Sequence, residues 1–345
     1  MIYYKKNIYN ANIFEKYIEI CYIFIKIGRE IMEWYYILLI VIGTFIALNT
    51  IVFLLTAYIC FRLTFYVNRK KQINEEDMPF GDDYEEYKPL ILKYLKDAKT
   101  KTHQDFYIKS YDGLKLHGMY FHKYDNAPIE ILFHGYRGGA FRDMSAGIER
   151  AAKVGRNALI IEQRTTGESE GKVISFGINE RYDCVSWINF VIEHFGKDIE
   201  IYIGGVSMGG STVLLASSMN LPSNVKGILA DSSFYSAKDI IIKVLMDLKL
   251  PPRVFYPFIK IGAKLYGKFD LEKTSPLESV RKTDIPIIFY HGEKDNFVPY
   301  EMSVKLYMAC RSKKKLVSIK ESGHGLCYLV DPDKYVNELK DFLKA

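Results

Sequence analysis

The sequence is poor in cysteine and lacks any strong excess of one charge. Its five cysteines are scattered over 345 residues and include no C-x-x-C pair. An odd number without paired spacing argues against a disulfide framework and a zinc site, and it fits a reducing compartment. The formal net charge is only +6, and acidic residues accompany the lysines along the chain. We therefore expect no nucleic-acid partner, no metal and no cofactor.

Charged residues are absent from one long stretch, between Trp34 and Phe61. This apolar run exceeds the roughly 20 residues that a membrane helix needs, and aromatic residues flank it as they do at membrane interfaces. A cleaved signal peptide fits poorly, because the run is too long and no small-residue cleavage site follows. A buried core helix is the alternative. We predict a single transmembrane helix over residues 34–61.

The sequence before this run, residues 1–33, is rich in Ile, Tyr and Lys. It reads either as an interfacial amphipathic helix or as an upstream extension of a chain that starts at Met32. Basic residues follow the run at Arg62, Arg69, Lys70 and Lys71, and others precede it at Lys16, Lys26 and Arg29 unless the chain starts at Met32. The positive-inside bias then predicts a cytoplasmic C-terminal domain.

A polar connector follows over residues 62–105. It carries acidic runs at 75–77 and 82–83, which we interpret as a solvated linker. Apolar residues at helical spacing predict one short helix within it, from about Tyr84 to Ala98.

From residue 106 to the end, short apolar runs alternate with helical patterns. The predicted strands are 106–108, 114–120, 129–133, 158–161, 199–203, 225–230, 285–290 and 316–319, with a hairpin turn at Asp112-Gly113. The predicted helices are 144–154, 180–195, 300–310 and 333–343. Such alternation predicts an α/β fold, with a mostly parallel eight-stranded sheet covered by helices on both faces. Chemistry in such sheets gathers at the carboxyl ends of the strands.

Residues 232–284 interrupt this alternation, because they contain no clear strand. More than fifty residues between two strands are too many for a plain loop. The segment is apolar and aromatic, and we interpret it as a helical cap over the strand ends. Extra helical packing away from the site is the alternative.

Residues 205–209 read G-x-S-x-G, between an apolar run and the start of a buried helical pattern. A serine in so tight a strand-to-helix turn is held away from the sheet, and glycines on both sides avoid collisions. This context makes Ser207 a candidate nucleophile. A glycine-rich turn without chemistry is the alternative.

A serine hydroxyl needs a base, and the base needs a group that orients it. His324 follows the last predicted strand, in a loop that can reach over the sheet. Asp295 lies in a loop just past the strand at 285–290, and it is our candidate acid. Asp231, at the end of the preceding strand, is its rival. The order serine, acid, histidine is the one expected for α/β-hydrolases.

Negative charge on the substrate oxygen needs N–H donors that are already in place. The backbone N–H of Met208, immediately after the serine at a helix start, is one candidate. The loop after the strand at 129–133 supplies the other, and we favour Tyr136 because Gly135 lets the backbone come close.

These motifs together resemble a membrane-anchored branch of the α/β-hydrolase superfamily over residues 106–345, similar to bacterial serine-aminopeptidase-like and acyl-esterase-like hydrolases. The resemblance rests on four motifs in order: His134-Gly135, the G-x-S-x-G turn at residues 205–209, the loop from His291 to Pro299, and Gly323-His324. It implies a catalytic triad of Ser207, Asp295 and His324, with oxyanion donors at Tyr136 and Met208. Residues 162–169 depart from the pattern of many relatives, since Thr165 replaces a glycine.

The sequence therefore predicts a membrane-anchored serine hydrolase that forms an acyl-enzyme on an ester, thioester or amide. An apolar cap favours a lipophilic or acyl small-molecule substrate. A peptidase like the aminopeptidases is a second hypothesis, in which Asp239 or Asp247 would hold a substrate amine. An acyltransferase and a non-catalytic, membrane-tethered binding protein on the same fold are further alternatives.

Overall fold

The computed structural model of the chain describes residues 2–68 and 83–344. Within it the chain divides into two compact units, residues 1–57 and 58–345. The acidic run at 75–77 of the predicted connector lies outside the described residues.

The first unit is formed by helix α1 (Ile2–Thr64), which runs on into the second unit. The predicted boundary between residues 33 and 34 falls inside this continuous helix. The segment 15–64 is long and apolar enough to cross a membrane by length and composition, and its most apolar window is not buried at all. This exposure argues against the core-helix alternative, because a core helix packs its apolar side chains inside the protein.

The second unit is built on one eight-stranded sheet with the order β1-β2-β4-β3-β5-β6-β7-β8. Strand β2 pairs antiparallel with β1 and β4, and all other pairs are parallel. The predicted mostly parallel eight-stranded sheet is therefore confirmed. The strands are β1 (Gln104–Lys109), β2 (Lys115–Phe121), β3 (Ile129–Phe133), β4 (Asn157–Glu162), β5 (Ile201–Val206), β6 (Val225–Asp231), β7 (Ile287–Gly292) and β8 (Lys314–Ile319).

Strands β5 and β7 begin two residues later than the sequence predicts. The apolar residues Ile199 and Ile285 precede them and still pack, partly buried, against the core. Apolar character alone therefore extended the predicted strands too far toward their N-terminal ends.

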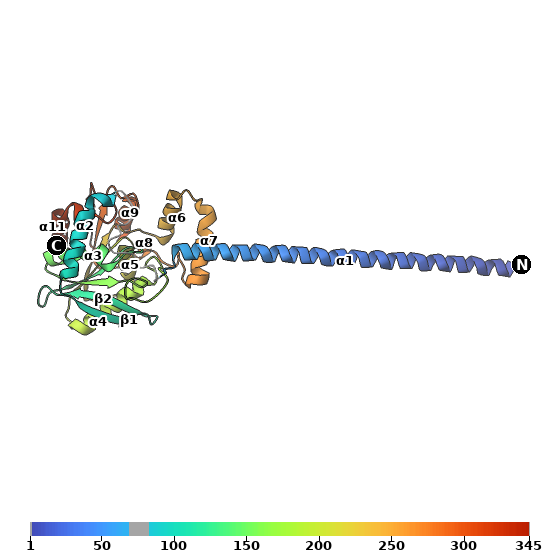
Figure 1. The fold of residues 1–345 in the computed structure, drawn as a ribbon, viewed down its shortest axis with the longest axis horizontal. Helices are drawn as coiled ribbons and strands as arrows, with labels where there is room; N and C mark the ends of the chain where they lie inside the picture. Colours follow the sequence, from blue (N-terminus) through green and yellow to red (C-terminus); the bar gives the residue numbers. More distant parts are fainter. Residues whose placement is uncertain (1, 69–82, 345) are drawn as a thin grey trace. The chain divides into compact units, whose positions relative to one another are not determined.

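Helices cover both faces of the sheet (Figure 1). Helix α3 contacts β3 and β4 and is flanked by α2, α10 and α11, whereas α5 contacts β3, β5 and β6 and is flanked by α4 and α8. The helices of this unit outside the cap are α2 (Asp83–Thr100), α3 (Ala140–Lys153), α4 (Glu180–Phe195), α5 (Met208–Ala216), α8 (Pro276–Val280), α9 (Glu301–Ala309), α10 (Cys327–Val330) and α11 (Pro332–Lys344).

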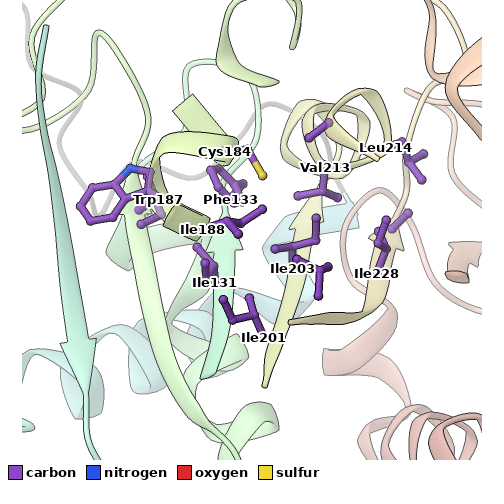
Figure 2. Packing of buried hydrophobic residues seen from close by; sticks show 14 of the residues in the cluster. Ile131, Phe133, Cys184, Trp187, Ile188, Ile201, Ile203, Val213, Leu214 and Ile228 are labelled. Atoms are coloured by element: carbon purple, nitrogen blue, oxygen red, sulfur yellow. The ribbon is translucent and has the colours of Figure 1, made fainter. Parts of the chain in front are cut away.

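The largest core cluster lies between the sheet and helices α4 and α5. Figure 2 shows Trp187 and Ile188 of α4 and Val213 of α5 above Ile131 of β3 and Ile203 of β5. Alternate strand residues point to the opposite face, where Leu132 and Ile160 pack under α3. This period of two fixes the register of the strands, because a slip by one residue would exchange the two faces.

The predicted helical cap is present between β6 and β7. It comprises α6 (Ala237–Asp247), α7 (Pro252–Gly262) and the short π-helix η1 (Ala263–Gly267), followed by α8. Ser236 caps α6 by accepting a hydrogen bond from the Asp239 N–H (3.3 Å), and Pro252 starts α7 with a backbone angle suited to a first helical position. The sequence between the helices thus sets where each of them begins.

The predicted polar connector proves more ordered at its start than the sequence suggests. Phe61 and Phe65 are buried in the same apolar cluster as the cap, and Tyr66 forms a β-bridge with Val173. The N–H of Val67 also donates to the Lys172 carbonyl (2.9 Å). Residues 61–67 therefore belong to the packed domain, because buried aromatic side chains hold them there.

Candidate active site

Ser207 occupies the sharp turn between β5 and α5. Its backbone angles are φ 57° and ψ −119°, a left-handed conformation that non-glycine residues rarely adopt. A Cβ at Gly205 would overlap the backbone of Gly209, and a Cβ at Gly209 would overlap the carbonyl of Phe133. The two glycines are therefore required by close backbone approach. Such strain persists only where the surrounding structure enforces it, and it gathers at functional sites.

The surroundings hold this turn in place, and the serine hydroxyl makes no hydrogen bond to the residues that the structure describes. The Ser207 N–H donates to the carbonyl of Asp231 at the end of β6 (2.8 Å). Ser207 stands at the N-cap of α5, yet its side chain makes no capping hydrogen bond. The hydroxyl is thus not used to stabilise the helix.

His324 and Asp295 are joined directly. The His324 Nδ1 and the Asp295 Oδ2 lie 2.7 Å apart, although they come from loops after different strands. The other carboxylate oxygen, Oδ1, accepts from the N–H groups of Phe297 (3.0 Å) and Val298 (2.7 Å). In a neutral imidazole, donation from Nδ1 to Asp295 leaves the lone pair on Nε2 of His324. This arrangement is the one that a general base requires.

Asp295 is held in its ionised form. Burial by itself would raise the pKa of its carboxyl group, but His324 and His291 interact with the carboxylate by charge and hydrogen bonding and lower the pKa well below its usual range. Since the side chain is fully buried, its negative charge acts on His324 without screening by water. A buried carboxylate of this kind stabilises the imidazolium that forms when the base takes a proton.

In the described part of the chain, no hydrogen bond or ion pair joins the rival acid, Asp231, to His324. Asp231 accepts a hydrogen bond from the hydroxyl of Ser232 (3.0 Å), and burial raises the pKa of its carboxyl group. The Ser232 hydroxyl also accepts from the N–H of Gly325 (3.0 Å), next to the histidine. Asp231 and Ser232 therefore support the backbone of the histidine loop, and the geometry favours Asp295 as the orienting acid.

The histidine loop lies against the serine turn. A Cβ at Gly325 would come within 2.9 Å of the side chain of Val206, the residue before Ser207. No hydrogen bond joins Ser207 to His324 in the described part of the chain. Catalytic hydrogen bonds are often long without substrate and tighten only when it binds.

The loop after β3 runs beside Ser207, since a Cβ at Gly135 would lie 3.5 Å from the Cβ of Ser207. His134 is buried and fixes this loop through its ring, with Nδ1 2.8 Å from the Gly135 carbonyl and Nε2 accepting from the Gln163 N–H (3.2 Å). Burial lowers the pKa of His134, so its ring stays neutral and can accept that bond. The loop is thus built before any substrate arrives.

Both predicted oxyanion donors lie at backbone positions without an acceptor of their own. Met208 is the first residue of α5, where N–H groups have no intrahelical partner. The N–H of Tyr136 makes no hydrogen bond to any described residue. Binding of a developing oxyanion requires N–H groups of this kind, which are not committed to other acceptors.

The sequence analysis did not single out His291 as a contact of the candidate acid. The ring is fully buried, with Nε2 3.1 Å from the Asp295 carboxylate and 2.8 Å from the Val298 carbonyl. Its Nδ1 lies 2.6 Å from the Ser303 hydroxyl. The spacing of four residues between His291 and Asp295 was the available signal, but only the turn after β7 brings the two side chains together.

Another missed contact comes from α2. The Tyr84 hydroxyl donates to the backbone carbonyl of His324 (2.7 Å), across 240 residues of sequence. No motif marks Tyr84, because the contact depends on where α2 packs.

The departure at Thr165 is explained by the backbone. Thr165 has φ 82°, so it adopts a left-handed conformation that favours glycine. Nearby Arg164 is bound by the carboxylate of Asp183 through Nε (2.6 Å) and Nη2 (2.7 Å). The loop thus keeps its path at the cost of backbone strain, and Arg164 is occupied in structure.

No group of three or more His, Cys, Asp and Glu side chains that could hold a metal ion occurs in the ranges that the structure covers. An apolar cluster that includes Met208 and Phe234 extends instead from the serine turn into the cap, with Ile240 and Tyr256.

Comparison with known proteins bears on this architecture. In a search of solved structures, an esterase of Pyrococcus furiosus, Pf2001, superposes with a TM-score of 0.59 at 23% identity, over 72% of this chain and 92% of the esterase. The chain has the α/β-hydrolase fold. The profile of the prolyl oligopeptidase family matches residues 175–345 of this hydrolase-fold chain, the part that carries Ser207, Asp295 and His324.

The chain is also similar in sequence to proteins of a bacterium and a yeast. YqkD of Bacillus subtilis, an uncharacterised protein, is 26% identical over 69% of this chain and 78% of its own length. YNL320W of Saccharomyces cerevisiae, described as an uncharacterised membrane protein, is 26% identical over 55% of this chain and 61% of its own length. The family profile and the structural neighbour together support the resemblance to the α/β-hydrolase superfamily.

Proposed function

We propose that the chain is a serine hydrolase that cleaves an ester, thioester or amide through an acyl-enzyme on Ser207. The observation that supports it most is the combination of a strained Ser207 turn with a His324–Asp295 pair on the adjoining loop. Serine alone is a weak nucleophile, and this combination supplies the base and its orienting acid.

In the proposed mechanism the Ser207 Oγ attacks the substrate carbonyl carbon, and its proton passes to Nε2 of His324. The N–H groups of Tyr136 and Met208 bind the resulting oxyanion. Collapse of the tetrahedral intermediate expels the leaving group, which takes the proton from His324. Water then repeats the attack on the acyl-enzyme, with His324 again as base, and releases the acid and free serine.

An acyl or lipophilic substrate fits the surroundings of the site. The apolar cluster of the cap reaches Met208, the residue after the nucleophile. The carboxylates that a peptidase would need for a substrate amine are already engaged. Asp247 pairs with Lys243. The Asp239 carboxylate interacts with the Tyr235 hydroxyl, and burial together with this interaction raises the pKa of Tyr235 to about 12.

We also propose that α1 anchors the protein as a single-pass membrane helix, with the hydrolase domain on the cytoplasmic side. The support is an exposed apolar helix followed by basic residues at Arg62 and 69–71. Membrane sedimentation of the full chain tests the anchor, and recovery in the soluble fraction would overturn it.

A fluorophosphonate probe tests the enzyme proposal directly. It should label the wild-type chain and fail to label Ser207→Ala, because only an activated serine reacts at a useful rate. Absence of labelling in folded wild type would leave the non-catalytic alternative. Esters of increasing acyl length, assayed beside aminoacyl amides, then separate an acyl hydrolase from a peptidase, and an added alcohol or amine acceptor reveals acyl transfer.

A further inference from the structure

The loop after β3, which carries Tyr136 and Arg137 and is called the oxyanion loop below, is hydrogen-bonded to the C-terminal end of α1. The Tyr136 hydroxyl donates to the Thr64 carbonyl (2.6 Å). The neighbouring Arg137 donates through Nη2 to the carbonyls of Leu63 (2.9 Å) and Tyr66 (3.3 Å). The last carbonyls of a helix have no partner within it, so these two side chains satisfy groups that would otherwise depend on water.

The acceptors are fixed by the fold. The Phe65 ring is buried between Phe176 (centroids 5.8 Å apart) and Phe269 (5.2 Å), in edge-to-face contacts. The Ile174 N–H donates to the Phe65 carbonyl (2.8 Å), beside the β-bridge at Tyr66. The helix end is therefore a rigid support within the hydrolase unit, to which the loop is attached.

The donors are also constrained. Arg137 has φ 50°, so the loop adopts a strained turn at the residue that makes two of the three bonds. The Tyr136 ring packs against Phe176 (5.0 Å), the same ring that contacts Phe65. Tyr136 thus has its side chain fixed to α1, and the residue before it, Gly135, lies beside Ser207.

We propose that the end of α1 positions the oxyanion hole. The bonds from Tyr136 and Arg137 to residues 63–66 hold the Tyr136 N–H toward the developing oxyanion, an inference that rests on the proposed serine-hydrolase function. Tyr136 and Arg137 act here as positioning side chains, since neither side chain touches the reacting atoms. The C-terminal end of α1 then helps to position the active site, in addition to the proposed role of this helix as a membrane anchor.

The test uses the full chain in detergent with a soluble chromogenic ester. Tyr136→Phe removes the hydroxyl and keeps the backbone N–H. Arg137→Asn removes both Arg137 bonds and places at φ 50° a residue that tolerates it. Each variant should lower kcat roughly 10- to 100-fold with little change in KM, below the roughly 100- to 1,000-fold for outright loss of a donor. Affinity for a boronic acid transition-state analogue should fall by the same factor as kcat/KM.

Tyr124→Phe is the matched control. The Tyr124 hydroxyl donates to the carbonyl of Ala152 at the end of α3 (3.0 Å). The substitution therefore removes the same kind of hydrogen bond, from a tyrosine outside the loop that carries Tyr136. It should keep wild-type kcat. Arg137→Lys, which can restore one donor, should recover part of the loss. Thermal unfolding of each variant checks that the fold is intact.

Wild-type kcat in both folded Tyr136→Phe and Arg137→Asn would overturn the proposal. So would a rise in KM alone, or an equal loss in Tyr124→Phe. If Arg137→Asn does not fold, the result for Tyr136→Phe decides alone. Fluorophosphonate labelling separates the two levels, because an unlabelled wild type contradicts the hydrolase proposal, whereas a labelled enzyme with unaffected variants contradicts only the positioning role.

Discussion

The two sides of the proposed active site are held in different ways. On the acid–base side, Asp295 and His324 lie in loops after β7 and β8, and the partners of the Asp295 carboxylate come from β7 and those loops. On the oxyanion side, Tyr136 lies in the loop after β3, and its side chain is bound to the end of α1, outside the sheet. The first side relies on buried charge, and the second on a helix end and aromatic packing. Changes on the first side should therefore remove chemistry, and changes on the second should alter packing or alignment.

The largest effect is expected from the acid. Asp295→Asn should lower kcat by roughly 10⁴-fold, because an amide no longer holds His324 in the right tautomer or stabilises its charged form. Asp231→Asn should cost far less, since Asp231 contacts Ser232 and not His324. Steady-state kinetics of both variants measure the difference, and the reverse order would transfer the acid role to Asp231.

The packing of the α1 end should matter for stability. Phe65→Ala should lower the free energy of unfolding by about 3–5 kcal/mol, because it leaves a cavity among Phe176 and Phe269. Phe45→Ala, at an exposed position of α1, serves as the control and should leave unfolding of the hydrolase unit unchanged. Thermal or denaturant unfolding in the same detergent gives both values. Equal stability of the two variants would contradict the conclusion that residues 61–67 belong to the packed domain.

Acid should weaken the acid–base side selectively. The pKa of folded Asp295 is depressed, so its ionisation contributes stability that is fully present above the unfolded pKa of about 3.9. That contribution is lost as pH falls below about 4 toward the folded pKa. The stability of Asp295→Asn should therefore fall less steeply than that of wild type over this window. Unfolding curves measured at successive pH values test this slope, and parallel curves would show that Asp295 is not held ionised by its histidines.

The smallest effect is expected at Thr165, away from both sides. Thr165→Gly should raise stability by up to about 1 kcal/mol, since φ 82° suits glycine and strains a β-branched residue. Activity should not change. Val173→Gly, at an ordinary backbone position, should instead lower stability. A loss of stability in Thr165→Gly would mean that the threonine side chain contributes more than its backbone strain costs.

Much of the fold could be predicted from the sequence. Apolar runs at period two, separated by helical patterns, predicted the parallel sheet, and the long interval before β7 predicted the cap. The glycines at 205 and 209 marked the serine turn, because no other residue fits where backbones approach so closely. Strand starts were less certain, since Ile199 and Ile285 are apolar for packing reasons outside the strands.

The contacts among distant residues could not be predicted. Nothing near His291 announces that its ring meets Asp295, and nothing near Tyr84 announces that it bonds to His324. The sequence also assigned residue 62 onward to a polar connector, because Arg62 and the charges after residue 68 dominate its composition. Only packing shows that Phe65 is inside the domain.

The sequence by itself determined most helices and strands, the position of the serine turn, the candidate acid and base, and the apolar N-terminal helix. These are local properties, set by side-chain size, periodicity and backbone freedom over a few neighbours. The tertiary structure alone decided that Asp295 faces His324 while Asp231 does not, and that Tyr136 is bound to Thr64. The Asp295–His324 and Tyr136–Thr64 pairs join residues 29 and 72 positions apart in the sequence, and they depend on how loops and helix ends meet once the sheet has formed.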